Sequence, residues 1–349
     1  MNKTSLTKAG ILTLVLVIIA VASWELYVRS KGFDTNYDDN PALWADKRAM
    51  IYEPADKATV FIGSSRIKFD LDIPLWEQIT GDHAIQLACV GSSPRPVLDN
   101  LADDKNFKGK LIVDVTEVLF FNYAPNSTQL PDDNIKYYKD RTPAQRASFV
   151  VNRLLESQFA FLDKDRLSLN ARLANLHVPN RKGVFEEPTF PAEFGWVRFD
   201  RQEFMTERFA ADTVKRNKVI GIWQFFAKMS KDPPASGGKL DSIFASVKVS
   251  VDKLRARGGQ ILFVRTPSSG GFLMGEKMGY PREKYWDRLL VETKCAGIYF
   301  ADYPAIANFQ CPEESHLSQP DAAIFTKNFI KILNEEKGWA FAKLPAPVK

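Results

Sequence analysis

The clearest candidate for a reactive side chain in this sequence is a serine in a tight turn. It lies in Gly63-Ser64-Ser65-Arg66, directly after the short apolar run 58–62. A short apolar run ended by Gly and Ser predicts a buried strand of a parallel sheet, and Pro74 predicts a helix soon afterwards. Open α/β sheets bind ligands at the carboxyl ends of their strands, and a helix N-terminus there presents unpaired N–H groups to negative charge. The turn therefore suits a nucleophilic serine. The alternative is a Gly-Ser turn that only joins two elements, since the Gly-x-Ser-x-Gly pattern of α/β-hydrolases is absent.

A serine nucleophile needs a base, and the chain has three histidines: His83, His177 and His316. Only His316 has an acid three residues earlier, in a loop that precedes the last predicted helix. An acid-x-x-His loop can bend so that the carboxylate accepts from one ring nitrogen and leaves the other free to take a serine proton. This spacing favours Glu313 over Glu314 as the orienting acid. The alternative is a surface loop in which the histidine caps a helix.

The elements that must position these residues read as a parallel α/β domain. The predicted strands are 58–62, 83–90, 110–115, 260–264 and 297–301, and the predicted helices include 96–104, 281–295 and 319–336. We expect a three-layer α/β/α, flavodoxin-like sheet with strand order 2-1-3-4-5. The turn at Ser65, the turn at Gly91 and the strand end at Thr116 would then meet in one crevice. The α/β domain comprises 58–119 and 240–337, and 338–349 is a tail.

A mostly helical insertion, 120–239, interrupts this domain. Within it Thr142-Pro143-Ala144-Gln145 predicts a capping box at the start of a helix. The segment 184–204 is rich in aromatic residues. These aromatics either pack as an ordinary loop onto the core or form a lid or acceptor groove, because long insertions are often functional.

The amino-terminal segment 1–29 predicts a membrane anchor. Lys3 and Lys8 precede an apolar run from Ala9 to Trp24, which extends to Val28 with few interruptions. About 20 apolar residues of helix cross a bilayer core. A cleavable signal peptide ending near Ala20-Val21-Ala22 is the alternative. Either one places residues 30–349 outside the cytoplasm, with 30–57 as a stalk.

Composition excludes several other classes. The chain has 349 residues and a formal net charge of +5, and its basic residues are scattered, which does not favour nucleic-acid binding. No CxxC pair is present, so a structural zinc site is not expected. No metal or organic cofactor is implied. Cys295 and Cys311 either pair in an oxidising compartment or remain buried thiols.

Three blocks in this order resemble the SGNH (GDSL-like) hydrolase superfamily: Gly63-Ser64-Ser65, Gly91, and Glu313-x-x-His316-Leu317. The chain looks most like the membrane-anchored branch that includes the D-alanyl-lipoteichoic acid biosynthesis protein and alginate O-acetylation proteins. The resemblance implies that Ser65 is the nucleophile and that the N–H groups of Ser65 and Gly91 form an oxyanion hole.

Two departures from the family pattern stand out. The third block usually supplies an Asn to the oxyanion hole, whereas this chain has Val113-Asp114-Val115-Thr116-Glu117, in which Thr116 is the available substitute. The last block usually has Asp three residues before His, where this chain has Glu313; Glu can serve the same role.

The function implied is a serine acyl hydrolase or O-acyltransferase that acts on acyl esters of a cell-envelope glycan, with a multispanning membrane acyltransferase as a partner. Arg66 and Arg265, at the ends of the first and fourth strands, would bind an acidic group on the substrate or form ion pairs at the core edge. The alternative function is a non-catalytic envelope protein that keeps the fold for binding or assembly.

Overall fold

The computed structural model describes residues 3–174, 176, 188–230 and 233–347. The chain divides into two compact units: unit 1 comprises Met1–Asp38 and Thr142–Glu186, and unit 2 comprises Asp39–Arg141 and Glu187–Lys349. These boundaries differ from the predicted ones. Of the expected insertion 120–239, only residues 142–186 lie outside the α/β unit. Of the expected stalk, residues 39–57 are part of the α/β unit. His177, one of the candidate bases, lies outside the described residues.

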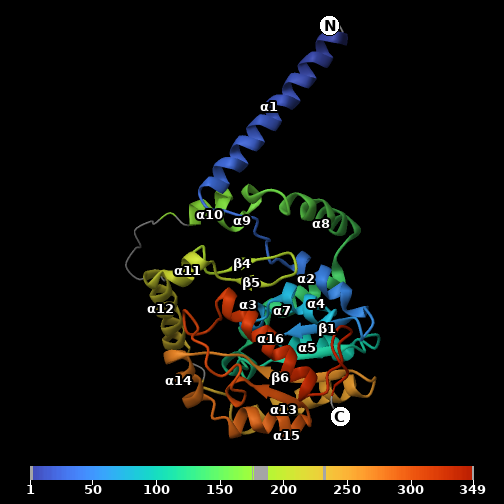
Figure 1. Ribbon diagram of the computed structural model, residues 1–349, viewed down its shortest axis with the longest axis vertical. Coiled ribbons are helices and arrows are strands. Elements are labelled where there is room, and N and C mark those ends of the chain that lie inside the picture. Colours follow the sequence, from blue (N-terminus) through green and yellow to red (C-terminus); the bar gives the residue numbers. More distant parts are fainter. Residues whose placement is uncertain (1–2, 175, 177–187, 231–232, 348–349) are drawn as a thin grey trace. The chain divides into compact units, whose positions relative to one another are not determined.

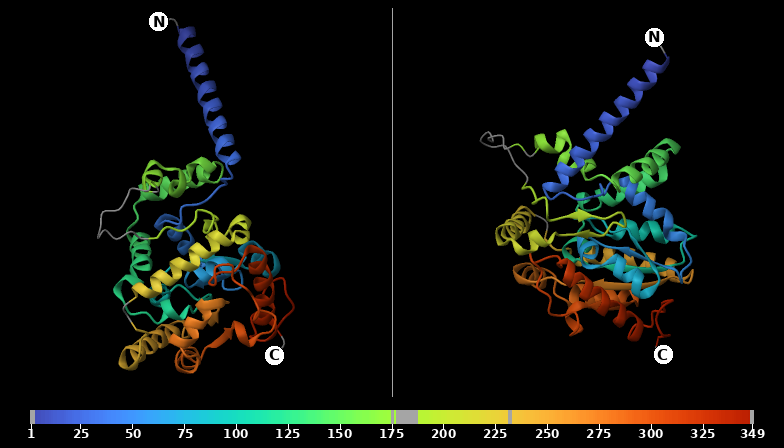
Figure 2. Two further views of the ribbon diagram at one scale, coloured as in Figure 1. Left: turned by 90° about the vertical axis from the view of Figure 1, so that its left-hand side faces the viewer. Right: turned by 45° about the horizontal axis from the view of Figure 1, so that its top comes forward.

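Unit 2 is built on a five-stranded parallel sheet (Figures 1 and 2). Its strands are β1 (Ala58–Ile62), β2 (His83–Gln86), β3 (Lys110–Asp114), β6 (Gln260–Arg265) and β7 (Ala296–Tyr299). Their order is β2-β1-β3-β6-β7, which confirms the predicted parallel α/β sheet and its strand order. Every residue of β1 and β3 is buried, and this explains why both strands are continuous apolar or β-branched runs with few polar interruptions.

The helices of unit 2 pack in two groups. One group consists of α3 (Ser65–Asp70), α4 (Ile73–Thr80) and α16 (Gln319–Glu335); the other consists of α5 (Arg95–Asp103), α13 (Gly237–Arg255) and α15 (Arg288–Thr293). Pro74 lies in the first turn of α4, as predicted, but a separate short helix, α3, begins at Ser65 itself. The predicted helix 281–295 is a π-helical turn, η4 (Glu283–Asp287), followed by α15.

The connections of unit 2 contain further elements. They are α2 (Pro41–Arg48), η1 (Ala49–Tyr52), α6 (Glu117–Phe120), η2 (Pro125–Ser127), α7 (Gln129–Asp140), β4 (Trp196–Val197), β5 (Glu203–Phe204), α11 (Glu207–Ala211), α12 (Thr213–Met229), α14 (Gly270–Gly279) and η5 (Phe300–Asp302). Strands β4 and β5 form a small antiparallel pair of their own.

Unit 1 contains α1 (Lys3–Ser30), α8 (Pro143–Glu156), η3 (Ala160–Leu162), α9 (Lys164–Leu167) and α10 (Leu169–Ala174). In α1 the 26 residues Ser5–Ser30 are long and apolar enough to span a membrane. The predicted capping box is present at the start of α8: the Thr142 hydroxyl accepts from Gln145 N–H, and the Gln145 side chain accepts from Thr142 N–H.

The end of β1 approaches β3 so closely that only glycine fits at position 63. A Cβ atom at Gly63 would lie 2.6 Å from the Cβ of Asp114 and 2.8 Å from the Cγ2 of Ile67. The missing side chain therefore lets the turn that carries Ser64 and Ser65 pack directly against the end of β3.

We expect Gly63→Ala to destabilise the protein by about 1–3 kcal/mol, because the added methyl group overlaps backbone-proximal atoms. Gly221→Ala is the matched control: no atom lies within 4 Å of a Cβ at this position in α12. Alanine there should stabilise the helix by up to about 1 kcal/mol. Denaturant unfolding of the full-length protein measures both changes. An unchanged midpoint in Gly63→Ala would contradict the close packing.

Candidate active site

Three side chains from opposite ends of the chain form a continuous hydrogen-bonded series. The Ser65 hydroxyl lies 2.9 Å from Nε2 of His316, and Nδ1 of His316 lies 2.9 Å from Oε1 of Glu313. Ser65 begins α3 directly after β1, and the other two residues lie in the loop before α16. Ser65 is partly exposed, whereas His316 and Glu313 are buried. Ser65 is therefore the member of the series with exposed surface.

The loop separates the roles of its two neighbouring acids. Glu313 also accepts the backbone N–H of His316 at 2.6 Å, which fixes the carboxylate beneath the ring. Glu314 has a positive φ of 76° and turns away: its Oε2 accepts the N–H of Phe272 at 3.0 Å, at the start of α14. Gly270, which the Glu314 carboxylate packs against, has a φ of +56°, a conformation that favours glycine. The geometry agrees with the spacing that favours Glu313.

An indole on α12 holds the second oxygen of Glu313. Trp223 Nε1 donates to Oε2 of Glu313 at 2.5 Å, and a hydrogen bond to a charged acceptor is among the stronger kinds. Both carboxylate oxygens of Glu313 therefore have donors. No signal in the sequence pointed to Trp223, which lies 90 residues from Glu313 and belongs to no motif.

Aromatic rings surround the imidazole. The ring centroid of His316 lies 4.4 Å from that of Phe69, 5.7 Å from Phe194 and 6.0 Å from Trp223. Phe194 comes from the aromatic-rich segment, and Phe190 in turn stacks on Phe194. This part of the segment packs on the site itself, and it restricts water around the base.

A buried charge cluster anchors the segment that carries Phe194. Arg201 donates to both carboxylate oxygens of Asp39 and to the carbonyl oxygens of Gln86, the last residue of β2, and Ala88, just beyond it. Lys68 on α3 pairs with Asp39 at 2.6 Å and with Glu203 at 3.1 Å. Burial alone would raise the pKa of Asp39, but Arg201 and Lys68 together hold it well below its usual value. The cluster thus ties the aromatic segment to the helix that begins with Ser65.

A second carboxylate holds the loop of His316 in place. Asp70 Oδ1 accepts the N–H of Leu317 at 2.9 Å, and within the described residues Asp70 Oδ2 has no hydrogen-bond partner. Burial raises the pKa of Asp70 to about 7, although the Leu317 N–H and the nearby His316 and Arg66 oppose the shift.

The two backbone donors expected for an oxyanion hole lie at the same sheet edge. Cys89 N–H donates to the Gly63 carbonyl at 3.1 Å, so β1–β2 pairing continues past the strands, and Ser65 and Gly91 each follow two residues later. Gly91 is exposed with a φ of +60°, which favours glycine. Within the described part of the chain, neither N–H has a hydrogen-bond partner.

The Thr116 hydroxyl is engaged elsewhere. It donates to Asp114 Oδ2 at 3.1 Å and lies 2.7 Å from the hydroxyl of Ser64, in a buried cluster that Thr266 completes. Burial raises the pKa of Asp114, and hydrogen bonds with these groups oppose the shift. The expectation that Thr116 replaces the family's Asn in the oxyanion hole is not supported by this geometry, because the hydroxyl is buried between Asp114 and Ser64.

Arg66 and Arg265 lie in the core. Their side chains are 1% and 0% exposed, and both pair with Glu276, Arg66 at 2.6 Å; Arg265 also pairs with Glu117 at 3.1 Å. Burial would lower the pKa of Arg265, but Glu117 and Glu276 raise it above its usual value. This arrangement corrects the substrate-binding interpretation and favours the alternative, an ion pair at the core edge, since neither guanidinium faces solvent.

The three cysteines are free and buried, so Cys295 and Cys311 are not joined. Among the residues that the structure describes, no group of three or more His, Cys, Asp or Glu side chains is placed to hold a metal ion. Comparison of the chain with models of known protein families and with curated proteins finds no match. The site is therefore interpreted from its own geometry.

The raised pKa of Asp70 predicts a pH-dependent loss in the free energy of unfolding. Between about pH 4 and pH 7 the folded protein keeps a proton that the unfolded chain releases, so stability falls as pH rises through this window and the loss is complete above it. Asp70→Asn keeps the acceptor for Leu317 N–H without a buried charge. We expect the variant to gain stability relative to the parent above pH 7, on the order of a few kcal/mol, and to gain nothing near pH 4.

Denaturant unfolding across pH 4–8.5 measures this difference. Asp103→Asn, which removes an exposed carboxylate on α5, is the control and should leave the profile nearly unchanged. Parallel profiles for the parent and Asp70→Asn would contradict the assignment.

Proposed function

We propose that this protein is a membrane-anchored, extracytoplasmic serine acyl hydrolase or O-acyltransferase with an SGNH-like, flavodoxin-like fold. The observation that carries the proposal is the unbroken series Ser65–His316–Glu313, with a partly exposed hydroxyl at its open end. The strand order β2-β1-β3-β6-β7 supports it, because this order has its switch point between β1 and β3, beside the turn that carries Ser65.

The geometry supports a double-displacement reaction. Nε2 of His316 takes the proton of Ser65 as its oxygen attacks the acyl carbonyl, and Glu313 stabilises the imidazolium through Nδ1–H. The N–H groups of Ser65 and Gly91 would stabilise the oxyanion. His316 then protonates the departing alkoxide, which leaves an acyl ester on Ser65. A second hydroxyl, deprotonated by His316, attacks this ester and regenerates the serine.

The surroundings of His316 favour transfer over hydrolysis. The imidazole is 1% exposed and is covered by Phe69, Phe194 and Trp223, so water has little access to the base. An acceptor that brings its own hydroxyl to Ser65 would compete well at such a site. The acceptor class, a hydroxyl of a cell-envelope glycan, and the partner, a multispanning membrane acyltransferase that supplies the acyl group, follow from the family resemblance.

One observation favours the second candidate, a non-catalytic binding or assembly protein. The Thr116 hydroxyl is engaged with Asp114, which leaves two backbone donors for the oxyanion. Loss of one oxyanion donor lowers kcat about 10²–10³-fold in a serine protease. A protein that lacks this donor is therefore expected to be a slow enzyme, whose rate can still be told apart from that of an inactive protein.

Covalent labelling with a fluorophosphonate tests the nucleophile. We expect Ser65→Ala to abolish labelling and Ser64→Ala to retain it, because the Ser64 hydroxyl is buried against Thr116 whereas Ser65 contacts the base. In-gel fluorescence of the full-length protein reads the result. Labelling that persists in Ser65→Ala and disappears in Ser64→Ala would exclude Ser65, and an unlabelled parent protein would favour the non-catalytic candidate.

Trp223→Phe tests the positioning of Glu313. The ring contacts are kept while the N–H to Glu313 is lost, and a hydrogen bond to a charged group is worth about 1.5–3 kcal/mol. We expect kcat for hydrolysis of p-nitrophenyl acetate to fall about 10-fold or more with little change in KM.

Trp196→Phe is the matched control for this measurement. It also removes an indole N–H, one that donates to the Ala192 carbonyl at 3.1 Å, and should leave kcat unchanged. Equal losses in the two variants would show that Trp223 acts through general stability and not through Glu313.

A further inference from the structure

Helix α8 of unit 1 has its apolar side exposed. Val150, Val151 and Leu154 are 48%, 57% and 60% exposed, and with Ala147 they recur at the i, i+3, i+4, i+7 spacing of one helical face. No residue of α8 is buried. A helix of a water-soluble unit normally turns such a face inward. We therefore expect this face to contact an apolar surface or an apolar solvent outside the described chain.

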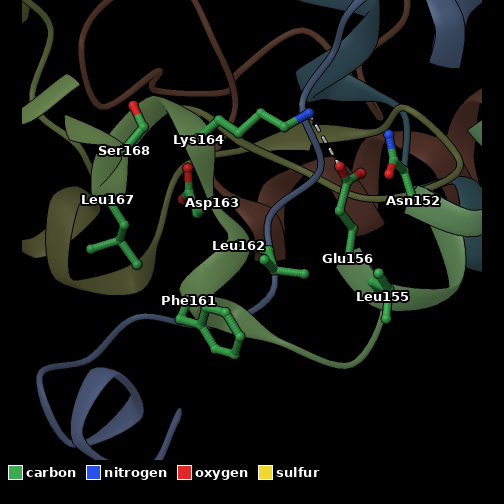
Figure 3. Close-up of a pocket in the computed structure, with 9 residues that line it drawn as sticks. All are labelled: Asn152, Leu155, Glu156, Phe161, Leu162, Asp163, Lys164, Leu167 and Ser168. Atoms are coloured by element: carbon green, nitrogen blue, oxygen red, sulfur yellow. Dashed lines mark ion pairs between the residues drawn. The ribbon is translucent and has the colours of Figure 1, made fainter. Parts of the chain in front are cut away.

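The opposite side of α8 is turned toward the rest of unit 1. Phe149 and Glu156 on this side are half-buried, and Glu156 pairs with Lys164 at 3.4 Å. The exposed apolar surface continues at Leu155, which lines a cavity of about 290 Å³ together with Phe161 and Leu167 (Figure 3). The other lining residues include Asn152, Glu156 and Lys164, so polar and apolar side chains line this cavity together.

Hydrogen bonds join the end of α8 to the end of α1. The Glu25 carboxylate of α1 accepts the N–H groups of Ala160 and Phe161 at 3.0 and 3.2 Å, and Arg29 donates to the Gln158 carbonyl at 3.3 Å. Gln158, Ala160 and Phe161 lie two to five residues beyond Glu156, the last residue of α8. The segment is therefore held at the level of residues 25–29 of α1.

That level coincides with the membrane surface if α1 spans a bilayer. A helix of 26 residues is about 39 Å long, longer than a hydrocarbon core of about 30 Å, so its last turns extend into the interface. The first acid of the helix is Glu25. Trp24, one residue before it, stacks on Tyr27, two residues after it, and aromatic residues of this kind are typical of the membrane interface. The apolar face of α8 is consequently tied to the headgroup region.

We propose that α8 lies in the membrane–water interface, with Val150, Val151, Leu154 and Leu155 immersed among the lipids of the bilayer that α1 spans. The inference rests on α1 being a membrane anchor. Helices of this kind have a polar face that carries Lys or Arg. Here Arg146 and Arg153 flank the apolar face, and the only acid of α8, Glu156, is already paired with a lysine. Helix α10 of the same unit exposes Leu169 and Leu173 by 73% and 55%, one helical turn apart.

A lipid-quenching experiment tests the proposal. Full-length Leu154→Cys protein, labelled with the polarity-sensitive fluorophore NBD, is reconstituted into vesicles of phosphatidylcholine and phosphatidylglycerol that contain lipids with a shallow nitroxide quencher. Asn152→Cys, an exposed polar position on the same helix, is the matched control. The three native thiols are buried, and the unsubstituted protein measures their residual labelling.

We expect loss of NBD emission with the quencher lipid at position 154 and no loss at position 152, where aqueous iodide should quench instead. Equal iodide quenching at both positions would overturn the proposal, because the apolar face would then lie in water. Protection of position 154 from both quenchers would also overturn it, since a protein surface would then cover the face.

Leu16→Cys, in the middle of α1, separates failure of this proposal from failure of the anchor. A nitroxide placed deep in the acyl chains should quench NBD at position 16. If it does not, α1 is no membrane span and the proposal for α8 falls with it. If it does while position 154 stays in water, only the proposal for α8 is wrong.

Discussion

The hydrogen bond between the Ser65 hydroxyl and Nε2 of His316 is the contact on which this structure's chemistry depends. It joins residues 251 positions apart, so no local feature of either segment can create it. The parallel sheet brings the ends of β1 and β3 together, and the absence of a side chain at Gly63 lets the serine turn approach the sheet. Asp70, at the other end of the six-residue helix that Ser65 begins, then fixes the histidine loop through Leu317 N–H.

Buried charges hold the surroundings of this contact. Arg66 and Arg265 share Glu276 on one side, and Lys68 and Arg201 share Asp39 on the other. Desolvation makes buried pairs weak contributors to net stability, yet removal of one partner is strongly destabilising because it leaves the other unpaired. Such clusters therefore select one packing arrangement over others, and they add little to the net free energy of unfolding. In this protein they join α3 to α14 through Arg66 and Glu276, and α3 to the segment of Arg201 through Lys68 and Asp39.

The sequence predicted the sheet well, because short apolar runs bounded by Gly, Pro and charged residues are a local signal. The bounds of β1 agree to the residue, and the strand order follows from the general rules for parallel sheets. Glu313 was favoured over Glu314 because the spacing of an acid and a histidine in one loop is also local. Which of the two serines faces the base required the family resemblance.

Features set by tertiary contacts could not be predicted in this way. Trp223 reaches Glu313 from α12, a helix of unit 2 that the sequence analysis assigned to the insertion, and no pattern in α12 distinguishes this indole from a core residue. The sequence left two roles open for Arg265, a ligand contact at the crevice or an ion pair at the core edge, and only the contact with Glu276, 11 residues later, decides for the ion pair. The helical period of α8 was visible, whereas the direction of its apolar face depends on the contacts of α1 and η3.

The central claim, that Ser65 is a nucleophile activated by His316, is tested most directly by trapping the acyl-enzyme. The full-length protein is mixed with p-nitrophenyl acetate, quenched in acid and digested, and the acetylated residue is identified by tandem mass spectrometry. We expect an acetyl ester on Ser65 that forms with an equimolar burst of nitrophenolate and is lost in His316→Ala. Acetylation that avoids Ser65, or that forms equally fast without His316, would contradict it.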